Sequence, residues 1–162
     1  MKVLKIFAFS DASFAGLEGG NSQLGYIILL GDISKRVAPI SWSSKKAKRV
    51  CRSALTAETL AASEALDAAF VVKEMMEDVL HSDRVEIDLY TDSKSLYDTV
   101  RTSNVLADKR LMIDIAAIRE MVDRKQIEVH WVDTNEQLAD GLTKAGANKQ
   151  KLREVLSSAQ LC

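Results

Sequence analysis

The sequence lacks the features that would mark a secreted, membrane-spanning or zinc-binding protein. Its two cysteines, Cys51 and Cys162, and its two histidines, His81 and His130, have neither the spacing of a zinc site nor that of a disulfide framework. No run approaches the roughly 18 to 20 apolar residues that a bilayer span needs, and the N-terminus alternates too strongly for a signal peptide. We therefore expect no membrane partner, an intracellular, cytoplasmic location and reduced thiols.

The sequence also has little net charge, −1 over 162 residues, which by itself argues against a nucleic-acid partner. The charge is unevenly spread, however. Residues 33–57 hold seven basic and no acidic residues, which leaves 15 basic and 23 acidic residues, a net −8, on the other 137. Two readings of this basic segment are open: a solvated loop, or a contact with a phosphate backbone that positions a nucleic acid.

Breakers of regular structure are few, with one proline and seven glycines. The length and the apolar content of 47% suit a single domain, which we expect to span residues 1–162. Residues 3–9 form two alternating apolar sets, which predicts a strand buried on both faces. Pro39 predicts that its strand lies at a sheet edge, and the glycine-rich residues 16–21 predict a turn.

The pattern of elements predicts an α/β domain with a mixed sheet. The expected strands are 3–9, 24–31, 36–43, 84–91 and 126–132. The expected helices begin at Ser53 or Ala54 and run to about Leu80, then cover 93–102, 109–124 and the end of the chain from Asn135, with a break at Gly146. Short connections among the first three strands favour an antiparallel meander.

Two aspartates follow predicted strands. Asp11 comes directly after the first strand and Asp92 directly after the fourth. In open α/β sheets, ligand-binding and catalytic groups gather at the carboxyl ends of strands. The alternative is that each caps a helix, although Ser93 is an equally good N-cap for the helix that follows Asp92.

Glu58 lies on the long predicted helix with an unusual set of neighbours. The residues at i−4, i−3, i+3, i+4 and i+7 are all apolar, so its carboxylate should point toward the core. A lone buried carboxylate costs several kcal/mol, so it must be neutralised, paired or bound to a metal ion. A buried ion pair with a lysine remains an alternative.

Asp140 carries little signal by itself. Thr134 and Gln137 match a capping box, which predicts a helix from about Asn135 with Asp140 in its second turn. The residues around Asp140 on such a helix are polar, as for an ordinary exposed acid.

Four acids without a nearby nucleophile or basic histidine favour metal chemistry. Carboxylate oxygens suit Mg²⁺ or Mn²⁺, and two such ions about 4 Å apart can hold the attacking and leaving oxygens of a phosphodiester displacement. A rigid sheet edge gives the fixed geometry that Mg²⁺ demands.

Five stretches, taken together, resemble the ribonuclease H domain of copia-type LTR retrotransposon Pol polyproteins, within the ribonuclease H-like superfamily. They are "FSDASFAG", "SQLGYIILLGD", "ISWSSKKAKRVCRSALTAETLAASEA", "YTDSKSL" and "VHWVDTNEQLADGLTK". The resemblance implies a ribonuclease H-like fold, with a five-stranded mixed sheet flanked by helices and its first strand at the centre. It also implies that Asp11, Glu58, Asp92 and Asp140 are the catalytic, metal-binding carboxylates for two Mg²⁺ ions, with Mn²⁺ as a substitute.

The implied activity is cleavage of the RNA strand of an RNA–DNA hybrid, which leaves a 3′-hydroxyl and a 5′-phosphate during retrotransposon reverse transcription. One ion would activate water and the other would stabilise the departing 3′-oxygen, with Asp11 bridging them. Candidate contacts to 2′-hydroxyls are Ser13, Asn21, Ser22, Gln23 and Ser93. Candidate contacts to phosphates are Lys45, Lys46, Lys48, Arg49 and Arg52. An adjoining reverse transcriptase domain would be a partner, and the location would include retrotransposon particles.

Two departures from the family stand out. Residues 133–139 contain no histidine where cellular members carry one in a loop, and Thr59 replaces a tyrosine common in copia elements. His130 lies within a strand pattern and is interpreted as a structural or half-exposed strand residue. Two rival functions remain. A catalytically silent module that binds nucleic acid or protein should lack one of the carboxylates. An exonuclease or integrase-like enzyme should have different motifs around its acids.

Overall fold

The computed structural model describes residues 3–15, 20–81, 84–102, 106, 108–147 and 149–161. Most of the predicted turn at 16–21 lies outside the described residues, and so does Cys162. Cys51 is a free, buried thiol, as predicted.

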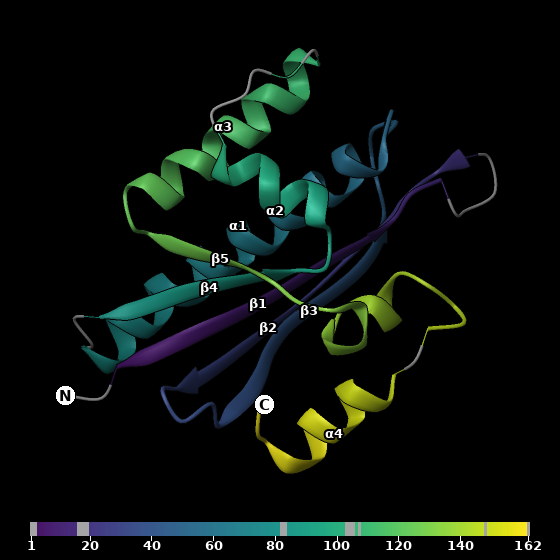
Figure 1. Ribbon diagram of the computed structural model, residues 1–162. Coiled ribbons are helices and arrows are strands. Elements are labelled where there is room, and N and C mark those ends of the chain that lie inside the picture. Colours follow the sequence, from purple (N-terminus) through teal and green to yellow (C-terminus); the bar gives the residue numbers. More distant parts are fainter. Residues whose placement is uncertain are drawn as a thin grey trace.

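A five-stranded mixed sheet with β1 at its centre organises the fold (Figure 1). The first three strands are antiparallel, whereas β4 and β5 run parallel to β1, which confirms the predicted sheet. The edge strand β3 carries Pro39, also as predicted. The strands are β1 (Leu4–Ser13), β2 (Gln23–Asp32), β3 (Val37–Lys46), β4 (Val85–Thr91) and β5 (Ile127–Trp131), in the order β3-β2-β1-β4-β5.

The alternating apolar sets of β1 are buried on both faces of the sheet. Ile6 and Ala8 belong to the larger core, and Phe7 and Phe9 belong to a second core on the other face. However, β1 continues to Ser13, beyond its predicted end at residue 9. Asp11 therefore lies within the strand, paired with Gly25 of β2, and not after the strand.

Three helices cover the larger core on one face of the sheet: α1 (Ala54–Leu80), α2 (Lys94–Arg101) and α3 (Lys109–Asp123) (Figure 1). The helix α1 begins where it was expected to, and its N-cap Ser53 accepts a hydrogen bond from the backbone N–H of Thr56 at 3.1 Å. Alanines on the sheet-facing side of α1 are almost fully buried, which lets the helix lie close to the strands. On the opposite face, α4 (Gln150–Ser158) contributes Val155 to the second core.

The predicted helix is wrong between Asn135 and the break at Gly146, whereas after the break the chain is helical in α4, as predicted. Residues 134–142 contain two single 3₁₀ turns, η2 (Thr134–Glu136) and η3 (Asp140–Leu142). The residue that caps η2 is Asp133, because its side chain accepts from the N–H of Asn135. The side chain of Gln137 does not close a capping box but donates to the Ser10 carbonyl of β1 at 2.9 Å. This contact holds the segment against the sheet in place of a regular helix.

Within the part of the chain that the structure describes, we find no helix with the length and apolar character of a membrane span.

Candidate metal centre

Asp11, Glu58 and Asp92 meet at one end of the central strands. The parallel register pairs Phe9 of β1 with Tyr90 of β4, which sets the aspartates two residues further along beside each other. Each of the three acids offers a carboxylate oxygen, and these oxygens lie within 4.8 Å of one another. We call this set the three-acid group.

The alternative readings of two of these acids are not supported. The N-cap of α2 is Ser93, whose hydroxyl accepts from the N–H of Leu96 at 3.2 Å, so Asp92 is not needed as a cap. No lysine among the described residues forms an ion pair with Glu58. The helix thus directs at the ends of β1 and β4 a carboxylate that has no ion-pair partner among the described residues and accepts a backbone hydrogen bond from Ala12.

The two oxygens of the Asp11 carboxylate have different surroundings. Its Oδ2 accepts hydrogen bonds from the hydroxyl of Thr143 and from Lys144 Nζ, the latter at 3.0 Å. Its Oδ1 and the Oε2 of Glu58 are shielded from solvent and have no hydrogen-bond partner in the described part of the chain. Because unpaired buried carboxylate oxygens are costly and are hard ligands, they fit a site for Mg²⁺ or Mn²⁺.

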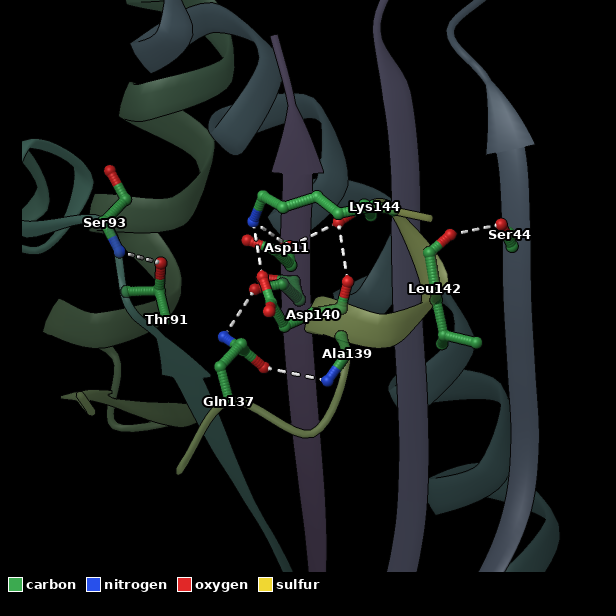
Figure 2. A network of polar contacts seen from close by, with 11 residues as sticks. Asp11, Ser44, Thr91, Ser93, Gln137, Ala139, Asp140, Leu142 and Lys144 are labelled. Atoms are coloured by element: carbon green, nitrogen blue, oxygen red, sulfur yellow. Dashed lines mark hydrogen bonds and ion pairs between the residues drawn. The ribbon is translucent and has the colours of Figure 1, made fainter. Parts of the chain in front are cut away.

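The fourth acid, Asp140, lies beside the three-acid group and is joined to it through a lysine (Figure 2). Lys144 Nζ pairs with Asp140 Oδ1 and with Asp11 Oδ2 at the same time. Asp140 is only 8% exposed, unlike the exposed acid that its sequence neighbours suggest. The structure therefore gathers all four predicted carboxylates at one edge of the sheet.

Burial is the main cause of the unusual acidities in this cluster. The pKa of Glu58 is raised from 4.5 to about 9, first by burial and then by the nearby charges of Asp11 and Asp92. Burial also raises the pKa of Asp11 from 3.8 to about 6, although the hydrogen bond from Thr143 and the charge of Lys144 lower it. Negative charge is thus concentrated here beyond what one lysine neutralises, which favours a cation.

These shifts predict that the metal-free protein becomes less stable as the pH rises from about 5 to 9. Folded Glu58 and Asp11 hold protons that the unfolded chain has already released, so the free energy of unfolding falls through this window. We expect the melting temperature to drop by about 4–8 °C, or about 2 kcal/mol, with a much smaller drop in Glu58→Gln. Thermal denaturation in a chelator measures this, and an equal drop in both proteins would contradict it.

Three residues that position the acids were not predicted. Thr143 holds Asp11, Lys144 links Asp11 to Asp140, and Gln137 ties the preceding loop to β1 (Figure 2). Gln137 and Thr143 are buried. All three lie in the stretch "EQLADGLTK", but the contacts join residues more than 120 positions apart, which local patterns do not reveal.

The predicted 2′-hydroxyl contacts flank the acids on two sides. Ser13 ends β1 opposite Gln23, and Ser93 follows Asp92 directly. The side chain of Gln23 donates to Ser44 Oγ at 2.9 Å. Ser22 is only 3% exposed and accepts from the N–H of Ala15, which leaves it less accessible to a ligand than its neighbours, among them Asn21.

The basic segment begins beside the acids. Asp11 pairs with Gly25 and Gly25 pairs with Ser44, so the following residues of β3 leave the sheet near the cluster. Two of the predicted phosphate contacts are engaged elsewhere: Lys45 pairs with Glu64 at 3.1 Å, and Arg49 pairs with Asp114. Lys46, Lys48 and Arg52 are exposed, as is Lys45 despite its ion pair.

His130 lies outside the three-acid group, on β5. Its ring stacks on Tyr90 with centroids 4.9 Å apart, and its Nε2 lies 3.7 Å from Asp88 Oδ1 and 3.5 Å from Glu128 Oε2. Lys5 already pairs with Asp88 at 3.1 Å. His130 thus has the half-exposed strand position that its pattern predicts.

The fold and the acidic edge define a ribonuclease H-like domain. A solved structure with this fold is ribonuclease H1 from the archaeon Halobacterium salinarum, with a TM-score of 0.62 and 21% identity, covering 93% of this chain and 98% of that chain. Another is LC11-RNase H1 in complex with an RNA/DNA hybrid, with a TM-score of 0.54 and 15% identity, covering 86% of this chain and 93% of that chain. Likeness at this level of identity establishes the fold.

Sequence similarity identifies the relatives more closely. The chain is 34% identical over 139 residues to the retrovirus-related Pol polyprotein from transposon TNT 1-94 of Nicotiana tabacum, a match that covers 84% of this chain. The matched chain spans only 10% of the length of that relative. No protein-family model matches the chain. The chain therefore matches the ribonuclease H domain of a transposon Pol polyprotein, which confirms the predicted resemblance.

Proposed function

We propose that the protein is an endonuclease that cuts the RNA strand of RNA–DNA hybrids with the help of two divalent metal ions. The observation that carries this proposal is the convergence of Asp11, Glu58 and Asp92 from three separate elements, with unpaired buried oxygens on two of them. Burying such a group of carboxylates lowers the folding stability unless cations bind to it.

Divalent ions bound to these carboxylates supply the acidity that activates water and the positive charge that stabilises the departing 3′-oxygen. The chain itself supplies rigid placement. Asp11 is held within a central strand and fixed at Oδ2 by Thr143, while Glu58 projects from a helix that packs on the same strand. Fixed ligands of this kind favour one alignment of the scissile phosphate over others.

Two features support a hybrid as the substrate. The first is the relation to transposon Pol polyproteins, together with the hybrid bound to the structurally similar LC11-RNase H1. The second is the arrangement of polar and basic side chains around the acids. Ser13, Gln23 and Ser93 flank the three-acid group as candidate contacts to 2′-hydroxyls, which distinguish RNA from DNA. Lys46, Lys48 and Arg52 are exposed beyond it as candidate contacts to phosphates.

We further propose that the domain works beside a reverse transcriptase in a parent polyprotein, in the cytoplasm or in retrotransposon particles. The relatives are Pol polyproteins that are about ten times longer than the matched segment, since the chain covers 10% of the first of them. A neighbouring domain would add contacts to the hybrid that a small domain lacks.

The proposal is tested by incubating the purified protein and Mg²⁺ or Mn²⁺ with an RNA–DNA hybrid labelled on either strand, beside matched RNA–RNA and DNA–DNA duplexes. We expect cleavage of the RNA strand of the hybrid alone, with 3′-hydroxyl and 5′-phosphate ends, and none with Asp92→Asn. Binding of the hybrid without cleavage, also in the presence of a reverse transcriptase domain, would favour a silent binding module.

A further inference from the structure

Lys144 occupies an unusual position for a surface lysine. Its ammonium group bonds to Oδ2 of Asp11 at 3.0 Å and also to Oδ1 of Asp140. The Asp11 carboxylate is thus divided: one oxygen serves Lys144 and Thr143, and the other belongs to the unpaired oxygens of the cluster. The cluster therefore offers two unequal places for positive charge.

We propose that Lys144 is a tethered cation that takes the place of one of the two divalent ions in the metal-free protein, so that this ion binds only by displacing the lysine. The inference rests on the proposed metal-dependent function. It adds a prediction about the order of binding: one ion enters the three-acid group directly, and the second competes with Lys144.

Charge and geometry support unequal binding. The three acids each offer one carboxylate oxygen within 4.8 Å of the others. Oδ1 of Asp11 and Oε2 of Glu58 have no hydrogen-bond partner among the described residues, and Lys144 contacts only Oδ2 of Asp11, which leaves the former two oxygens open to one ion. A second ion between Asp11 and Asp140 would need the two oxygens that the ammonium group already holds. Two cations on the same carboxylate oxygen repel each other strongly at partly buried sites, so the ammonium group must leave when the ion binds.

The lysine side chain is able to leave. It is 42% exposed, although it contacts an Asp11 side chain that is only 1% exposed. Lys144 lies two residues after η3, in no helix or strand. A flexible four-carbon side chain can therefore turn outward without unfolding an element. Asp11 would keep the hydrogen bond from Thr143 during this change.

A purely structural ion pair would have a different consequence. Loss of Lys144 would then lower stability and leave the number of bound ions unchanged, because nothing would compete with the metal. Competition predicts the opposite change in metal binding. The two roles can be separated by counting ions in the absence of nucleic acid.

The test is calorimetric titration of Mn²⁺ into the wild-type protein, Lys144→Met, Lys144→Arg and the control Lys149→Met, all without substrate. Lys149 belongs to the same C-terminal segment, and its side chain lies over Gly141. We expect one ion of measurable affinity in wild type, Lys144→Arg and Lys149→Met. In Lys144→Met we expect two ions, or a second ion bound at least about tenfold more tightly than in wild type.

A measurement on the wild-type protein keeps the test independent of how well Lys144→Met folds. The NMR signal of the Lys144 ε-methylene group, assigned by its loss in Lys144→Arg, should stay unchanged while the first Mg²⁺ binds and shift at Mg²⁺ concentrations well above those of the calorimetric titration, where the weak second ion binds. Identical ion numbers and affinities in wild type and Lys144→Met, or a signal that does not respond to a second ion, would overturn the inference. Hybrid cleavage by the wild type tests the proposed function separately, because it does not depend on which ion binds first.

Discussion

Replacement of Asp11 by asparagine is expected to reduce cleavage of the RNA–DNA hybrid by about 10³-fold, with the fold intact. Asparagine keeps the size of the side chain and can still accept from Thr143, but it removes the charge on the oxygen that is unpaired and shielded from solvent. The measurement is the initial rate of cleavage with saturating Mg²⁺, beside a thermal denaturation curve that checks the fold.

Asp88 provides a matched control for this replacement. It is also a buried aspartate of an inner strand, but it forms an ion pair with Lys5. Burial raises the pKa of Asp88, but His130 and Lys5 lower it by more, so that the net pKa is lowered. Asp88→Asn should lower stability by about 1 kcal/mol and leave the cleavage rate within about twofold of wild type. Equal rates in Asp11→Asn and wild type, or equal losses in Asp11→Asn and Asp88→Asn, would contradict the assignment of the active site.

Gly25→Ala is expected to have the second large effect, about 100-fold on cleavage, although Gly25 carries no side chain. A Cβ atom on Gly25 would lie 2.8 Å from Thr143 Cγ2 and 3.0 Å from Leu142 Cβ. The segment that carries Thr143, Asp140 and Lys144 would have to move away from Asp11. Displacement of a positioning group by about 1 Å costs about two orders of magnitude in rate.

The control for this prediction is Gly146→Ala in the same segment, where an added Cβ meets no atom within 4 Å. We expect wild-type cleavage from Gly146→Ala and a loss of about 1–3 kcal/mol of stability from Gly25→Ala alone. Both quantities come from the same preparations, by cleavage assay and by denaturant unfolding. A Gly25→Ala protein with wild-type activity would show that the contact of the C-terminal segment with β2 does not position the acids.

Much of the fold was predictable because it follows from local patterns. The two apolar sets around Phe7 predicted a strand buried on both faces, and the run without glycine or proline after Ser53 predicted the long helix. Glu58 stood out because apolar neighbours surround it on a helix, and the structure half-buries it with one carboxylate oxygen shielded from solvent. Such signals are contained within a few turns of helix or a single strand.

The C-terminal segment was predicted less well because distant contacts decide its structure. The spacing of Thr134 and Gln137 matched a capping box, but Gln137 bonds to a carbonyl of β1, 127 residues away in sequence. Asp140 looked exposed because its neighbours in sequence are polar, whereas the fold buries it, and Lys144 bridges it to Asp11 of β1, 133 residues away from Lys144 in sequence. Local sequence does not reveal contacts of this range, so the positioning residues emerge only in the structure.

The central claim is that the edge formed by Asp11, Glu58, Asp92 and Asp140 is the metal centre of the protein. Anomalous diffraction from crystals soaked in Mn²⁺ tests it most directly, because manganese can be located without regard to activity. We predict an anomalous peak bound by Asp11, Glu58 and Asp92, and its loss in Asp11→Asn. Manganese bound only beside Asp88, Glu128 and His130, or at no site in saturating Mn²⁺, would contradict the claim.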